Sequence, residues 1–161
     1  TPALYVQKNA AAKARSVAAR FRNALIIGAD TVVVRRGKVL GKPRTMREAV
    51  AAIKFLNNAT HAVYTGLAIL DTADGTMLCG YEKTMVTFRR LSDREIRAYL
   101  AAINPLDKAG AYAIQGPGAL IVHGITGCYY NVVGFPVARL DEMLLKMGVS
   151  LFDYMLVRRK P

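Results

Sequence analysis

Residues 24–34 read Ala-Leu-Ile-Ile-Gly-Ala-Asp-Thr-Val-Val-Val, and this stretch decides the fold class. The apolar run Ala24–Ile27 predicts a buried strand, and Val32–Val34 continues the β signal. We expect the first strand to end in Gly28–Thr31. Because ligands of open α/β sheets bind where strands end, this pattern places the carboxylate of Asp30 well for function.

Four segments on either side of this stretch have the features of helices. Their starts carry Thr1 as an N-cap followed by proline, or the capping boxes Thr45–Glu48 and Ser92–Glu95, in which side chains bond to the backbone of the first turn. Gly148 suits the end of the last helix. The predicted helices cover residues 2–21, 45–56, 92–104 and 136–147.

The remaining regular segments predict strands. His61–Leu70 and Thr76–Phe88 are rich in strand formers and are separated by the hairpin signal Asp74-Gly75. Shorter strands are predicted at Leu120–Val122 and Tyr129–Val133. Because helices and strands alternate around a hairpin, we expect an α/β (mixed α+β) fold with a twisted, mixed sheet flanked by helices.

Length and composition narrow the class of protein. The chain has 161 residues, which is the length of one domain, so we expect a single domain over residues 1–161. Its hydrophobic fraction of 53% argues against disorder. The longest apolar runs are too short to span a bilayer and no signal peptide is visible, so we expect a cytoplasmic protein without a membrane partner. Two distant cysteines and two isolated histidines lack the spacing of metal ligands.

Positive charge is concentrated in the first third of the chain. The net charge is +12, and residues 1–60 carry 12 basic side chains against only Asp30 and Glu48. Such a field attracts polyanions, namely nucleotides, nucleic acid or anionic membrane. A cationic surface without such a partner is the plain alternative. The basic tail Arg158–Pro161 is predicted to be a frayed, solvated end.

Four polar side chains lie at predicted turns, strand ends or loops, or on the first helix. Asp30 could bind Mg²⁺ or take a proton from water, or it could serve only its local backbone. Lys42, held between a glycine and a proline, can reach a phosphate as a point charge, although exposed turn lysines are common. Lys13, on the predicted first helix, would by itself be interpreted as a solvated residue. Gln115 lies in a glycine-rich loop, structural or functional, and carries the paired donor and acceptor that a pyrimidine edge requires.

Taken in order, five motifs resemble the Maf proteins. The resemblance covers nearly the whole chain, and its second and fourth motifs are the most specific. The motifs are AxxKA at 10–14, GADTVV at 28–33, LGKP at 40–43, DKAGAYAIQG at 107–116 and YYNVVGFP at 129–136.

This resemblance implies a Maf/ITPase-like fold and Mg²⁺-dependent hydrolysis of nucleoside triphosphates to the monophosphate and pyrophosphate. It implies that Asp30 is the catalytic carboxylate, as general base or metal ligand, and that Lys13 and Lys42 bind phosphate. Thr31 and Gln115 resemble the pair typical of the branch that prefers dTTP and UTP. Members of the family are cytoplasmic and often dimeric, and are linked to septum formation or to cleansing of the nucleotide pool.

Two features depart from the family pattern. The usual N-terminal strand, Ser-Pro-Arg-Arg loop and helix, and the acidic stretch after them, have no counterpart from Thr1 onward, and Ala113 replaces a glycine. The arginine and glutamate of that segment would bind phosphate and metal. Because Asp30, Lys13 and Lys42 are all present, our main hypothesis is a pyrophosphatase of dTTP and UTP, or of modified nucleotides, with no nucleic-acid partner. The second is a non-catalytic relative that binds nucleotide or RNA.

Overall fold

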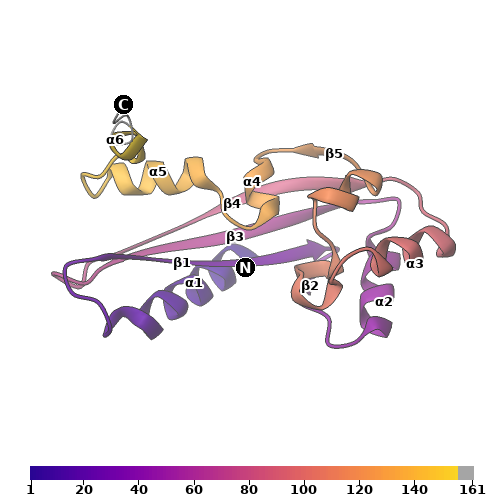
Figure 1. Ribbon diagram of the computed structural model, residues 1–161, viewed down its shortest axis with the longest axis horizontal. Helices are drawn as coiled ribbons and strands as arrows, with labels where there is room; N and C mark the ends of the chain where they lie inside the picture. The colour runs from indigo at the N-terminus through magenta and orange to yellow at the C-terminus, as the bar shows by residue number, and fades with distance from the viewer. Residues whose placement is uncertain (156–161) are drawn as a thin grey trace, which may run out of the picture.

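A computed structural model describes residues 1–155, which form one five-stranded sheet with helices packed against it (Figure 1). The strand order is β2-β1-β3-β4-β5. The strands are β1 (Leu25–Arg35), β2 (Lys38–Leu40), β3 (Thr60–Asp71), β4 (Met77–Phe88) and β5 (Val122–Thr126). The helices are α1 (Pro2–Ala18), α2 (Met46–Leu56), α3 (Asp93–Ala101), α4 (Tyr129–Val133), α5 (Val137–Leu145) and α6 (Leu151–Met155). Three single turns of 3₁₀ helix are η1 (Pro105–Asp107), η2 (Ala109–Ala111) and η3 (Gly116–Leu120).

The α/β class with helices flanking a single sheet is confirmed, but the pairing within the sheet differs from the expected mixture. Each of its four strand pairs is antiparallel. Tight turns join β1 to β2 and β3 to β4, and the predicted Asp74-Gly75 hairpin turn has Gly75 in the left-handed region. The connection through α3 joins the antiparallel neighbours β4 and β5, whereas the one through α2 crosses β1 and joins β2 to β3, which run in the same direction on either side of it. The tail Arg158–Pro161 lies outside the described residues.

The first strand is longer than expected. β1 runs without a break from Leu25 to Arg35, so the predicted strand end at Gly28–Thr31 is wrong. β1 pairs with β3 along nearly its whole length, whereas β2 covers its other side only at Val33–Arg35. The part of β1 before Val33 is therefore an open sheet edge, and Asp30 lies in the middle of this strand.

Close helix packing explains the glycine within β1. A Cβ atom added to Gly28 would lie 2.2 Å from the carbonyl oxygen of Ala10, and one added to Gly66 of β3 would lie 2.3 Å from the carbonyl carbon of Val6. The backbone of α1 thus rests directly on the sheet, which only glycine permits at these two positions. What looks like a turn signal in the sequence is a requirement of helix docking.

The two faces of the sheet are covered by different helices. On one face, Ala10 and Ala14 of α1 pack with Ala68 of β3. On the opposite face, α5 packs against Leu67 and Ile69. Because successive strand side chains point to opposite faces, neighbouring residues of β1 face different helices. A third and larger cluster joins the sheet to α2, α3 and the loop after α3, through residues that include Val33, Ile53, Val63, Phe88, Ile96 and Tyr112.

Helix starts were predicted well. Ser92 and Glu95 form the full capping box of α3. Thr45 caps α2 by accepting from the backbone of Glu48, but the Glu48 carboxylate accepts from the amide of Arg44, one residue earlier than expected. The first helix ends at Ala18 rather than near residue 21.

Two predicted strands near the C-terminal part are wrong. Tyr129–Val133 is helix α4, and Leu120–Val122 divides between η3 and the start of β5. Gly134 has a φ of 111°, and its amide donates to the carbonyls of Tyr130 and Asn131, which ends α4 with a left-handed cap. This cap, together with the hydrogen bonds from the Asn131 side chain to Val63 and Thr84, overrides the strand propensity of tyrosine and valine. α6 follows α5 and was not foreseen.

Candidate active site

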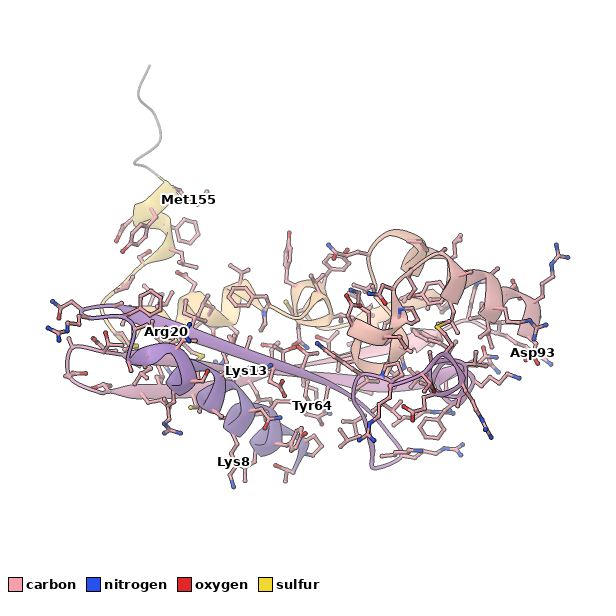
Figure 2. The ribbon with its side chains drawn as sticks, turned by 60° about the horizontal axis from the view of Figure 1, so that its bottom comes forward. Lys8, Lys13, Arg20, Tyr64, Asp93 and Met155 are labelled. Carbon is pink, nitrogen blue, oxygen red and sulfur yellow. The ribbon has the colours of Figure 1, made fainter. Side chains whose placement is uncertain are left out.

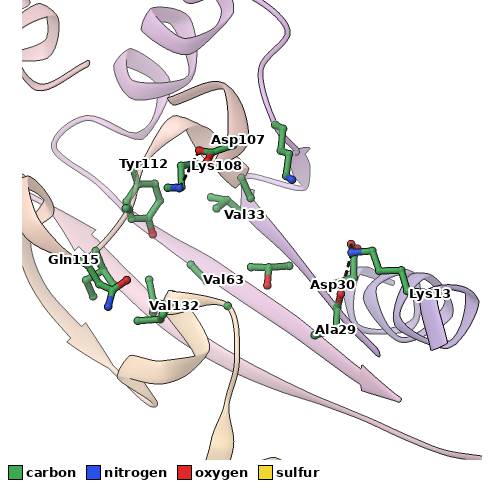
Figure 3. A pocket seen from close by; sticks show the side chains of 17 residues that line it. Lys13, Ala29, Asp30, Val33, Val63, Asp107, Lys108, Tyr112, Gln115 and Val132 are labelled. Carbon is green, nitrogen blue, oxygen red and sulfur yellow. Dashed lines mark hydrogen bonds and ion pairs between the residues drawn. The ribbon is translucent and has the colours of Figure 1, made fainter. Parts of the chain in front are cut away.

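A cavity of about 340 Å³ opens beside β1 (Figure 3). Its volume falls in the range of ligand pockets. Residues from α1, β1, the loop after β2, the loop after α3 and the end of α4 surround it. The cavity brings together all five residues singled out in the sequence, Lys13, Asp30, Thr31, Lys42 and Gln115.

The open edge of β1 lets this cavity reach both faces of the sheet. Asp30 points toward α1, because its carboxylate bonds to side chains of that helix. Thr31, the next residue, points to the opposite face and bonds to Thr65. Both nevertheless line the same cavity, since within residues 1–155 no strand pairs with this part of β1 on its outer side. The carboxylate of Asp30 and the hydroxyl of Thr31 therefore line one cavity from opposite faces of the sheet.

Two side chains of α1 hold Asp30 in place. The Nζ atom of Lys13 donates to Asp30 Oδ1 at 2.6 Å and to the carbonyl oxygen of Ala29 at 2.9 Å, and Asn9 Nδ2 donates to Asp30 Oδ2 at 2.9 Å. Asn9 and Lys13 are four residues apart and so share one helical face. The Asp30 side chain is only 16% exposed, against 56% for Lys13. An ammonium group has three protons. Among the described residues Lys13 uses two of them in hydrogen bonds, which leaves one for a ligand.

Helix α1 presents its lysines differently. Figure 2 shows Lys8 extending away from the body of the protein, whereas Lys13 lies on the side of α1 that faces β1. The ammonium group of Lys13 is thus held at the cavity by Asp30 and the carbonyl of Ala29, although more than half of the side chain is exposed.

Thr31 belongs to a chain of uncharged hydrogen bonds. Its Oγ1 lies 2.9 Å from Thr65 Oγ1, and Thr65 Oγ1 donates to the carbonyl oxygen of Asn131 at 3.0 Å. The Asn131 side chain in turn donates to the carbonyl of Val63 at 3.1 Å and to Thr84 Oγ1 at 2.9 Å. Thr65, Thr84 and Asn131 are completely buried. This network fixes α4, whose end forms one wall of the cavity.

The loops that carry Lys42 and Gln115 are tied to one another. The amide of Gly110 donates to the carbonyl of Gly41 at 3.0 Å, which joins the LGKP segment to the DKAG segment. Lys42 and Lys108 both line the cavity, and Lys108 pairs with Asp107 at 2.9 Å. The hydrogen bond from Lys108 holds the pKa of Asp107 below its ordinary value. Sequence reasoning missed this third lysine, although it belongs to the DKAGAYAIQG motif.

Tyr112 connects the cavity to the core. It lines the cavity, and its hydroxyl lies 2.8 Å from Nε2 of His61, a histidine that is only 1% exposed. Burial lowers the pKa of His61 to about 4, with the positive charge of Arg35 as a smaller cause. Burial also raises the pKa of Tyr112. Both groups are therefore neutral near pH 7 and support the cavity wall, while His123, in β5, is exposed.

Two carboxylates line the cavity, Asp30 and Asp107, and the second is paired with Lys108. Among residues 1–155, no three His, Cys, Asp or Glu side chains gather as a metal cluster. Mg²⁺, however, is commonly held by one or two carboxylates together with substrate phosphates and water. Asp30 supplies one such carboxylate at the cavity, and each of its oxygens keeps a lone pair beyond the bond it already accepts.

The cavity has two chemically distinct ends. In Figure 3 Lys13 and Asp30 lie at one end, and Gln115 lies near Val132 at the other. The first end carries the Lys13–Asp30 ion pair, and the Asp107–Lys108 pair lies beside Tyr112, whereas the end at Gln115 offers an amide beside apolar side chains. Such a cavity suits a ligand with an anionic part and a flat polar part, which is the chemistry of a nucleotide.

Fold and site together define an α/β protein with a nucleotide-sized, lysine-lined cavity. Residues 1–147 match the family model described as Maf-like protein, and the chain belongs to this family. A relative from Pelotomaculum thermopropionicum named dTTP/UTP pyrophosphatase is 49% identical over 151 residues, which cover 94% of this chain and 79% of the relative.

Other relatives carry the same name. One from Moorella thermoacetica is also 49% identical, over 94% of this chain and 78% of its own length. One from Clostridium botulinum (strain Kyoto / Type A2) is 43% identical, over 91% of this chain and 77% of its own length. No helix in residues 1–155 is both long and apolar enough to cross a membrane.

Proposed function

We propose that this protein is a nucleoside triphosphate pyrophosphatase that hydrolyses dTTP and UTP to the monophosphate and pyrophosphate. The observation that carries the proposal is the single cavity that joins Asp30 and Lys13 to Gln115. The names of relatives at 43–49% identity support it. Substrates of this class have the two parts that the cavity accommodates, a polyanion and a base.

The charged end suits the triphosphate. Water attacks the α-phosphorus, the bond from that phosphorus to the bridging oxygen breaks, and pyrophosphate leaves. Lys13 and Lys42 bind phosphate oxygens and offset the negative charge that shifts to the leaving group. Because the protein has little covalent chemistry to perform in such a reaction, positioning and charge supply most of the rate.

Asp30 has one of two roles in this proposal, proton acceptor for the attacking water or ligand of Mg²⁺. Its bonds to Asn9 and Lys13 fix its orientation in either case. When bound, a magnesium ion would neutralise phosphate charge at this end of the cavity. Asp30 would hold it with phosphate oxygens and water as the other ligands.

The uncharged end suits the base. Gln115 is exposed to the cavity and carries both a donor and an acceptor on one amide. Thr31 adds a hydroxyl from the floor of the cavity. A polar edge that pairs with both groups is retained, and a base that leaves them unpaired is rejected.

Pyrophosphate release from a panel of common triphosphates, with Mg²⁺ present, tests the proposal. We expect kcat/KM for dTTP and UTP to exceed that for ATP and GTP by at least about tenfold, or roughly 1.4 kcal/mol. The protein assayed should include any native residues that precede Thr1. Equal rates on purines and pyrimidines would remove the specificity and leave the pyrophosphatase. No hydrolysis at all would favour a nucleotide-binding protein without catalysis.

Two further predictions accompany this function. The homodimer implied by the family resemblance can be checked by size-exclusion chromatography with light scattering, which should give twice the mass of the chain. The cytoplasmic location can be checked by cell fractionation.

A further inference from the structure

Building on the proposed function, we propose that Thr65 and Asn131 force Thr31 to act only as a hydrogen-bond acceptor, so that the cavity selects uracil and thymine over cytosine. The residue that meets the base is Thr31. Thr65 and Asn131 do not line the cavity and act as positioning residues.

The direction of the hydrogen-bond chain follows from what each group can donate. A backbone carbonyl only accepts, so Thr65 must use its single hydroxyl proton in the 3.0 Å bond to the carbonyl of Asn131. Thr65 then has only lone pairs to offer in its 2.9 Å bond with Thr31. Thr31 is therefore the donor in that bond, and its own proton points away from the cavity.

Burial makes this direction stable. Thr65 and Asn131 have exposures of 0%, so no water competes for the hydroxyl proton. The side chain of Asn131 donates hydrogen bonds to Val63 and Thr84, and these bonds hold the main-chain carbonyl of Asn131 in position. Reversing the chain would break the bond from Thr65 to the main-chain carbonyl of Asn131, and that buried oxygen would then keep only its bond from the amide of Gly134.

A ligand that meets Thr31 must consequently bring a donor. Uracil and thymine carry an N3–H group between two carbonyl oxygens, whereas N3 of cytosine is an acceptor. With N3 of the base at Thr31 and the exocyclic group at position 4 turned to Gln115, Thr31 accepts from the first two bases and opposes N3 of cytosine with a lone pair against a lone pair.

Gln115 cannot make this distinction by itself. Gln115 is exposed, and among residues 1–155 its side-chain amide has no hydrogen-bond partner that would fix its orientation, not even as the N-cap of η3. An amide that turns over can donate to a carbonyl oxygen of uracil or accept from the amino group of cytosine. The choice between the two pyrimidines therefore falls to Thr31 and to the buried pair behind it.

The test compares UTP with CTP, and dTTP with dCTP, for the wild type, Thr65→Val and Thr65→Ser. We expect the wild type to prefer the uracil and thymine substrates by at least about tenfold in kcat/KM. Thr65→Val keeps the shape but removes the acceptor, so Thr31 becomes free to donate and the preference should shrink to near unity. Thr65→Ser restores the hydroxyl and should restore the preference.

Thr60→Val is the matched control. Thr60 lies on the same strand and forms the same type of bond, 2.9 Å to Thr87, but this pair is exposed and does not line the cavity. Its removal should leave the UTP-to-CTP ratio unchanged. A general effect of losing a threonine pair would alter the ratio in both valine variants, and that result would contradict the proposal.

A second measurement needs no variant. N3-methyl-UTP lacks the donor, and the wild type should handle it at least about tenfold less well than UTP. Calorimetric titration with UMP and CMP adds a readout that does not depend on catalysis. A preference for UMP without any hydrolysis would keep the inference and remove the proposed function. Equal use of UTP, CTP and N3-methyl-UTP, or an unchanged ratio in Thr65→Val, would overturn the inference.

Discussion

The two faces of β1 meet the cavity with opposite chemistry. On the α1 face, Asp30 and Lys13 form an ion pair of 2.6 Å, and the Lys13 side chain is 56% exposed. On the other face, Thr31 continues into a buried network without a charge. Charged groups at an open cavity interact with solvent and salt, whereas buried uncharged bonds are insensitive to both. One face is therefore suited to attract and hold an anion, and the other to recognise a shape and a hydrogen-bond pattern.

The largest effect should come from the charged face. Asp30→Asn removes the negative charge but keeps the size, and we expect kcat to fall by at least about 10²-fold, the usual scale of an acid–base or charge contribution. Stability should change little. Asp93→Asn is the control, because Asp93 pairs with Lys54 on an exposed surface outside the cavity. Near wild-type turnover in Asp30→Asn would take this residue out of the mechanism.

The next effect concerns the buried wall. The pKa of His61 falls from 6.5 to about 4 in the folded protein, so the unfolded chain binds a proton first as the pH decreases. The resulting contribution, about 3 kcal/mol of the free energy of unfolding, is fully present above pH 6.5 and is lost as the pH falls toward 4.

Urea unfolding between pH 7 and 4 measures this loss. His61→Phe should be less stable at pH 7 but should lack that component of the decline. His123→Gln changes the exposed histidine and should keep the wild-type decline. Parallel pH profiles for the wild type and His61→Phe would contradict the assignment.

A somewhat smaller effect is expected for the lysines. Lys13→Ala and Lys42→Ala each remove one charged hydrogen-bond donor, and kcat/KM should fall by roughly ten- to a hundredfold. Added salt should weaken triphosphate binding to the wild type more than to either variant. Lys54→Ala, outside the cavity, should change stability by no more than roughly 0.5 kcal/mol and leave activity intact. The same result in Lys13→Ala and Lys42→Ala would mean that neither binds phosphate.

The smallest effect should come from the uncharged end. Gln115→Glu replaces an amide by a group that only accepts, so the preference for dTTP and UTP over ATP and GTP should erode by about tenfold. The change is best measured as a ratio of kcat/KM values, because the extra negative charge will also weaken triphosphate binding in general. Gln7→Glu, which adds the same charge on α1, controls for that effect. An unchanged ratio would mean that Gln115 does not read the base.

The parts of the fold that were predictable depend on local signals. Ser92–Glu95 starts a helix and Asp74-Gly75 turns a hairpin through bonds within a few residues. The glycine of β1 was misinterpreted because its partner, the backbone of α1, lies far away in the sequence. Tyr129–Val133 was misassigned for a similar reason, since its helical form depends on contacts of Asn131 with β3 and β4.

The site was predictable to a similar extent. Asp30, Lys13 and Gln115 stood out by residue type and motif, and all three line the cavity. The reason for placing Asp30 at a strand end was wrong, and the open edge of β1 gives the correct one. Lys108 and the buried pair Thr65 and Asn131 were missed, because lysine in a loop and threonine in a strand carry no signal before the fold brings them together.

The central claim is that one end of the cavity binds the triphosphate and the other binds the base. Its most direct test is a crystal structure with the non-hydrolysable α,β-imido analogue of UTP. We predict that the triphosphate lies against Lys13 and Lys42, and that the uracil lies between Thr31 and Gln115 with N3–H directed at the Thr31 hydroxyl. A base bound at the Lys13–Asp30 end, or a uracil that turns another edge to Thr31, would contradict the account.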